Sequence, residues 1–192
     1  MTRPEQPGTP SQPTYADRVY RSPLAVVGGV LVLGIAAWMG GDAVVRGEGR
    51  TPWVAAAALL MVVPLVVAFS FRPAVYANDD RLRIRNPFRT IVLPWAAVES
   101  LRAQYTTEVL TEGGAKYQLW ALPVSMRDRK RSLRGSGEAV GSVATLGELR
   151  NLAEAGATRP SAKGEPSVRW AYEIVVPAVV GLVALVVLLV TG

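Results

Sequence analysis

The stretch RLRIRNPFRTIVLPW, Arg81 to Trp95, predicts two strands joined by a turn. In RLRIR, polar and apolar residues alternate, which is the pattern of a strand with one buried face. NPFR supplies the turn, with proline at its favoured second position, and TIVL returns as the next strand. An apolar segment long enough to cross a membrane ends about ten residues before this stretch begins. The sequence therefore predicts an arginine-edged β-hairpin directly beside a bilayer.

Three apolar segments predict transmembrane helices at residues 23–45, 52–71 and 172–191. Each is close to the roughly 20 residues that a helix needs to cross the hydrocarbon core. The alternative, buried helices in a soluble protein, is disfavoured because the segments carry no polar stripe. A cleaved signal peptide would have a shorter apolar core than the first segment, so we expect an anchor there. No segment has an ionisable residue at its centre, which argues against a transporter.

The positive charges predict the orientation. The first two spans form a hairpin, so the N-terminal tail and the insert between the second and third spans share one side. That side carries nineteen of the twenty-one Lys and Arg residues, and the insert at 72–134 alone holds twelve against six Asp and Glu. The positive-inside rule then predicts a multi-pass protein of the cytoplasmic membrane, with the tail and the insert in the cytoplasm.

The chain contains no cysteine and no histidine. Disulfides, thiolate or imidazole metal sites, cysteine nucleophiles and a histidine general base are therefore excluded. The clustered carboxylates of the insert, at 79–80, 108 and 112, lie at turns and hairpin ends, where turn chemistry explains them. We therefore expect no enzyme, no catalytic residue, no cofactor, no metal and no small-molecule substrate.

The remaining segments complete the predicted architecture. Residues 1–20 have the composition of a disordered tail. Residues 72–134 predict five or six short strands in an antiparallel meander, followed by a linker at 135–169 with an amphipathic helix at 146–155. Thr145 and Glu148 match a capping box, and Gly156 suits the position after the helix. The inner face of the sheet is expected to hold Leu82, Ile84, Ile91, Leu93, Val98, Leu101, Tyr117 and Leu119.

Two apolar spans followed by RPAVYANDDRLRIRNPFRTIVLPWAAVESLRA and then GGAKYQLWALPVS resemble a known family. The sequence is similar to actinobacterial membrane proteins that carry a bacterial pleckstrin-homology-like (PH-like) domain, of the low-molecular-weight protein antigen type. The resemblance covers about residues 20–130. It implies a PH-like β-barrel or half-barrel in a membrane setting, without catalysis or an agreed ligand. The insert has fewer predicted strands than a complete seven-stranded PH domain, so a partner subunit is one way to complete the sheet.

Two basic groups are the candidate contact sites for anionic lipid or a partner. In a strand, side chains two residues apart share a face, and a polybasic segment gains energy near anionic lipid. The candidates are Arg81, Arg83, Arg85, with Arg89 across the turn, and Arg127, Arg129, Lys130, Arg131 and Arg134. The alternative interpretation of both groups is a charged surface that keeps the domain soluble and its edges unpaired. Basic charge without a recognised motif does not indicate nucleic-acid binding.

The sequence thus predicts an α+β membrane protein, in which three transmembrane helices accompany a small antiparallel PH-like β-domain and one amphipathic helix. We expect the domain to be a non-catalytic protein-binding scaffold with its basic surface toward anionic lipid. Its expected partners are the lipid bilayer and a protein partner or a second copy of the chain. The alternative is a purely structural subunit, assembled in a membrane complex through its helices.

Overall fold

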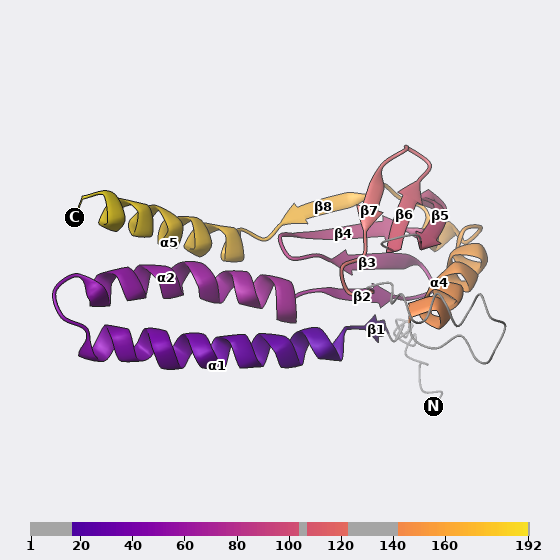
Figure 1. The fold of residues 1–192 in the computed structure, drawn as a ribbon. Helices are drawn as coiled ribbons and strands as arrows, with labels where there is room; N and C mark the ends of the chain where they lie inside the picture. Colours follow the sequence, from indigo (N-terminus) through magenta and orange to yellow (C-terminus); the bar gives the residue numbers. More distant parts are fainter. Residues whose placement is uncertain (1–16, 104–106, 123–141, 192) are drawn as a thin grey trace, which may run out of the picture.

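The computed structural model describes residues 17–103, 107–122 and 142–191. Three helices in it are long and apolar enough to cross a membrane: α1 (Pro23–Arg46), α2 (Thr51–Val66) with its π-helical extension η1 (Val67–Phe71), and α5 (Tyr172–Val190). Their bounds lie within one residue of the ranges expected from the sequence. The three helices lie side by side with α2 in the middle, and the β-domain stands at one end of them (Figure 1).

Small residues let these helices approach closely. A Cβ atom added to Gly181 of α5 would lie 2.5 Å from the backbone nitrogen of Met61 in α2, and one added to Gly40 of α1 would lie 2.6 Å from the Leu59 side chain. Helix association in membranes depends on such van der Waals packing, because lipid offers no hydrophobic driving force. At the start of α1, Pro23 occupies the first turn and the Ser22 hydroxyl accepts a hydrogen bond from the Ala25 amide at 3.4 Å.

The predicted hairpin forms as expected. β2 (Ala74–Ala77), β3 (Arg81–Arg85) and β4 (Arg89–Pro94) are consecutive antiparallel strands, with Ile84 opposite Ile91. The prediction of one continuous meander is wrong at η2 (Trp95–Ala97), a 3-10 turn that carries the chain into a second sheet. That sheet consists of β5 (Val98–Ala103), β6 (Thr107–Thr111) and β7 (Lys116–Gln118) in sequential antiparallel order.

Two further strands come from segments predicted to be a tail and a linker. β1 (Arg18–Tyr20) pairs with β2, and β8 (Ser167–Trp170) pairs with β4, which gives a five-stranded sheet in the order β1-β2-β3-β4-β8. Residues 18–20 are therefore ordered strand and not disordered tail. The chain itself thus supplies two strands, β1 and β8, beyond those expected between residues 72 and 134. Each of the strands β1, β2 and β8 is separated by only a few residues from one of the three apolar helices (Figure 1).

The amphipathic helix α4 spans Ser142–Gly156, four residues longer at its start than predicted. Thr145 therefore lies inside the helix and is not its cap, and Gly156 is its last residue. Leu146 and Leu149 bury the apolar face of α4 against the domain core. A Cβ atom at Gly156 would lie 2.5 Å from the Trp95 ring, so glycine is needed for this close approach.

The core lies between the two sheets and α4. Six of the eight predicted inner-face residues are buried in it, and the other two, Val98 and Tyr117, pack against it partly buried. Trp95 is fully buried at its centre and donates a hydrogen bond from Nε1 to the Asn78 carbonyl at 2.7 Å. The predicted α+β class is confirmed. The buried members of the core are Val75, Ala77, Leu82, Ile84, Ile91, Leu93, Trp95, Leu101, Val109, Leu119, Ala121, Leu122, Leu146, Leu149 and Ala162.

Candidate functional site

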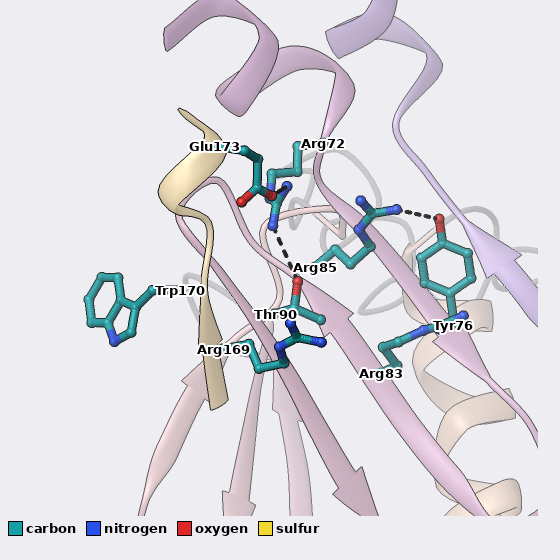
Figure 2. Close-up of a pocket in the computed structure, with 8 residues that line it drawn as sticks. All are labelled: Arg72, Tyr76, Arg83, Arg85, Thr90, Arg169, Trp170 and Glu173. Atoms are coloured by element: carbon teal, nitrogen blue, oxygen red, sulfur yellow. Dashed lines mark hydrogen bonds and ion pairs between the residues drawn. The ribbon is translucent and has the colours of Figure 1, made fainter. Parts of the chain in front are cut away.

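A pocket of about 370 Å³ lies on the outer face of the five-stranded sheet, at the end where α2 and α5 join the domain (Figure 2). We call it the arginine pocket. Its lining holds four arginines and a single carboxylate. The lining residues are Arg72, Tyr76, Arg83, Arg85, Thr90, Arg169, Trp170 and Glu173.

The sheet register brings these residues together from distant parts of the sequence. Arg85 lies opposite Thr90, and Thr90 lies opposite Arg169, so three adjacent strands contribute one row. Arg83 and Tyr76 form the next row, farther from the helices. Because side chains alternate along a strand, Leu82 and Ile84 point into the core while the arginines between them point outward.

Arg72 joins the end of α2 to the start of α5. Its Nη1 donates to Glu173 Oε1 at 2.8 Å, its Nη2 donates to Thr90 Oγ1 at 3.4 Å, and its Nε donates to the Asn86 carbonyl at 3.3 Å. The side chain is only 10% exposed, while that of Glu173 is 64% exposed. The donors of Arg72 are therefore used in contacts within the protein, and its charge is largely offset by Glu173.

Tyr76 is surrounded by guanidinium groups. Its hydroxyl accepts hydrogen bonds from Arg21 at 2.9 Å and Arg85 at 3.5 Å, and the Arg83 guanidinium carbon lies 4.5 Å from the ring centroid. Burial alone would raise the pKa of Tyr76, but the hydrogen bonds and positive charges of Arg21 and Arg85 lower it overall. The lowered pKa of this hydroxyl is a consequence of the guanidinium groups around it.

In the part of the chain that the structure describes, two arginines of the pocket form no ion pair with a carboxylate, although Arg85 acts on Glu173 through longer-range electrostatics. Arg83 is paired with Asp17 at 2.8 Å, but within the described ranges neither Arg85 nor Arg169 lies at ion-pair distance from a carboxylate. Arg169 is also exposed. Guanidinium groups bind carboxylates and phosphates through paired hydrogen bonds. The arrangement can therefore bind an anion, and phosphate oxygens fit its donors.

The structure places the predicted contact residues in different environments. Arg83 and Arg85 line the pocket, whereas Arg81 is exposed at the far end of β3, opposite Pro94. Arg89 does not join this row, because it lies on the other face, with its guanidinium 6.0 Å from the Tyr117 ring. The polybasic group at residues 127–134 lies outside the described residues.

Sequence reasoning missed Arg72, Arg169, Arg21 and Tyr76 as members of one site. The available signal was their position, since the three arginines directly flank the apolar spans. That position predicts orientation in the membrane. It does not show that their side chains meet on one sheet face.

The comparisons with known proteins agree with this architecture. Residues 72–151, which follow the second apolar helix, match the family model described as "Bacterial PH domain". The three apolar helices indicate that the protein associates with a membrane. No curated protein and no solved structure matches the chain.

Proposed function

We propose that this chain is a non-catalytic integral membrane protein whose PH domain binds the phosphate groups of anionic phospholipids through the arginine pocket. The observation that carries the proposal is that Arg85 and Arg169 make no ion pair with any described carboxylate, in a pocket located where α2 and α5 leave the domain. Because these helices are long and apolar enough to cross a membrane, we expect headgroup phosphates at this level. The pocket opens beside Trp170, and Trp and Tyr residues prefer the membrane–water interface.

The charge distribution supports an orientation with the domain toward the inner leaflet. In the short α1–α2 loop region, Arg46 is paired with Asp42 at 3.2 Å, and Arg50 donates to the Leu188 carbonyl. Both basic residues of that end are therefore engaged. The unpaired arginines lie at the opposite end, on the side that the positive-inside rule assigns to the cytoplasm, where anionic lipid is concentrated.

The expected consequence of lipid binding is orientation of the domain, and not its recruitment. A Lys or Arg near an anionic surface gains about 1 kcal/mol, and this gain fades within a Debye length. Because the domain is already held at the bilayer by three helices, its effective lipid concentration is high without any added affinity. Two unpaired arginines are enough to fix which face of the sheet lies against the headgroups.

The experiment uses the full chain in mixed micelles and measures its melting temperature with phosphatidylglycerol or phosphatidylcholine. A ligand that binds only the folded state raises the melting temperature. We expect phosphatidylglycerol to raise it, and the Arg85→Gln/Arg169→Gln variant to lose most of this rise. The matched control, Arg81→Gln/Lys163→Gln, removes the same charge at two exposed positions away from the pocket and should keep the rise.

An undiminished rise in the Arg85→Gln/Arg169→Gln variant would refute the proposal. A third arm with soluble glycerol phosphate separates the two sources of the phosphate group. Stabilisation by the soluble compound as large as that by the lipid would show a site for free phosphate esters, which also contradicts a lipid-binding function.

A second candidate function is scaffolding of a protein partner. It is favoured by a groove of about 490 Å³ between β5 and α4, along an edge of β5 that no described strand pairs with. The hydroxyl of Ser100 is buried there without a hydrogen-bond partner, while Arg150 already bonds to the Leu101 carbonyl at 2.8 Å. Photo-crosslinking from Glu99 in native membranes tests this candidate; crosslinks to lipid alone would contradict it.

A further inference from the structure

Five aromatic side chains gather at the membrane end of the domain, and of these only Trp170 also lines the arginine pocket. We call them the aromatic collar: Phe69, Phe88, Trp120, Trp170 and Tyr172. They come from η1, the β3–β4 turn, the residue pair after β7, the end of β8 and the start of α5. In Figure 2 Trp170 points away from the arginines, because it and Arg169 are neighbours on one strand and project to opposite faces.

Three members of the collar, Phe69, Phe88 and Trp120, pack against one another. The rings of Phe69 and Phe88 meet edge to face with centroids 5.4 Å apart, and the Phe69 and Trp120 centroids are 5.6 Å apart. Despite this packing, Phe69 is 43%, Trp120 49% and Trp170 57% exposed. Four of the collar residues, all except Tyr172, line a cleft of about 300 Å³ together with Asn86, Pro87 and Arg89.

The domain holds Trp120 rigidly in this position. The buried Asn86 donates from Nδ2 to the Gln118 carbonyl at 2.8 Å, and its Oδ1 accepts from the Trp120 amide at 3.4 Å. Asn86 belongs to the β3–β4 turn, so one side chain fixes the segment after β7 beside that turn. The exposure of Trp120 is therefore a feature of the fold.

An apolar groove continues from the collar toward the helices. It has a volume of about 400 Å³, shares Phe88 and Trp170 with the cleft, and is lined by Met61 and Leu65 of α2 and by α5 residues such as Val179. Contiguous exposed apolar surface of this kind marks an interaction site. Continuity with the two helices identifies its occupant as the bilayer that they cross.

We infer that the aromatic collar is inserted into the headgroup and upper acyl region of the membrane, so that the β3–β4 turn and Trp120 are part of the membrane-embedded protein. Amphipathic aromatic rings favour this zone, and Arg89 in the lining of the cleft can extend its charged end to the phosphates. This surface shares only Trp170 with the arginine pocket and needs no anionic lipid. Its insertion therefore does not depend on the proposed function.

The first test uses the intrinsic fluorescence of the full chain in phosphatidylcholine vesicles with acyl chains brominated near the carbonyl end. The difference between wild type and Trp120→Phe isolates the emission of Trp120. We expect this emission to lose most of its intensity in the brominated vesicles and to resist aqueous iodide. The matched control is Trp95→Phe, whose difference emission comes from the fully buried Trp95 and should respond to neither quencher.

The second test keeps the inference falsifiable if Trp120→Phe shifts the fold. The chain has no cysteine, so a nitroxide can be attached to Trp120→Cys or, as the control, to Lys116→Cys at the exposed start of β7. We expect the label at position 120 to be reached better by oxygen than by a water-soluble nickel complex, and the label at position 116 to show the reverse. Preference for the nickel complex at both positions, or iodide quenching of Trp120, would overturn the inference. We expect the same quenching and accessibility in vesicles that contain anionic lipid, because insertion of the collar does not depend on the arginine pocket.

Discussion

Gly181 sets the distance between α2 and α5, and we predict that Gly181→Ala destabilises the protein. The added Cβ would lie 2.5 Å from the Met61 nitrogen, 2.8 Å from the Leu60 carbonyl carbon and 2.9 Å from the Met61 Cα. All three atoms are backbone, so no rotamer change relieves the overlap. Ordinary contacts begin at 3.4 Å, and the helices must therefore separate by about 0.9 Å. A gap of 0.5–1 Å forfeits about a quarter to a half of each neighbouring dispersion contact.

The expected magnitude follows from two opposing effects. Overpacking of a close contact costs about 1–3 kcal/mol, while replacing glycine by alanine within a helix returns up to about 1 kcal/mol. We therefore expect Gly181→Ala to lower the free energy of unfolding by about 1–2 kcal/mol. The control is Gly34→Ala in α1, where an added Cβ meets nothing within 4 Å and only the helix-propensity gain remains.

The assay is equilibrium unfolding in mixed micelles, followed by far-ultraviolet circular dichroism of the full chain. We expect Gly181→Ala to unfold at lower denaturant than wild type, and Gly34→Ala to match or exceed wild type. If Gly181→Ala were as stable as Gly34→Ala, the close contact between α2 and α5 would be wrong, and so would the geometry that places Glu173 beside Arg72.

Two further predictions concern the domain. Asn86→Ala leaves the Gln118 carbonyl without the hydrogen bond described above, so it should cost about 1–3 kcal/mol in the same unfolding assay, against no measurable loss for the exposed Asn151→Ala. Burial and the hydrogen bond to Glu148 raise the pKa of Tyr20 to about 12, and the hydrogen bond from Tyr20 lowers the pKa of Glu148. The raised pKa of Tyr20 stabilises the folded protein fully below the unfolded pKa of 10.0. The lowered pKa of Glu148 stabilises the folded protein fully above the unfolded pKa of 4.5. The difference in free energy of unfolding between wild type and Tyr20→Phe should therefore be largest between pH 4.5 and pH 10.0. It should shrink as the pH falls below 4.5 or rises toward 12. A difference that does not change with pH would contradict the hydrogen bond between Tyr20 and Glu148.

The central hairpin and the helices are predictable from the sequence because their signals are local. Alternation in β3 and turn chemistry at Asn86 operate within a few residues, and an apolar run of sufficient length predicts a span without any tertiary information. The same alternation correctly assigned Leu82 and Ile84 to the core and Arg83 and Arg85 to the outer face.

The strands β1 and β8 are not predictable in this way. They have three and four residues, and β1 pairs with a strand beyond two membrane helices. Only the register of the assembled sheet decides that Arg169 lies opposite Thr90. The arginine pocket and the aromatic collar both depend on such long-range pairings, so composition could suggest a basic face but not its members. Arg89 shows the converse error, because proximity across a turn does not place a side chain on the same face.

The position of β1 has a consequence for how the protein is made. Translation delivers β1 first, but its partner β2 follows only after α1 and α2, and β8 follows last, immediately before α5. The outer strands of the larger sheet can therefore be added only around an already inserted helical hairpin. In a fragment that begins at Arg72, the edge of β2 would be unpaired, and unpaired strand edges promote aggregation. We therefore expect the larger sheet to be completed only after α1 and α2 have formed.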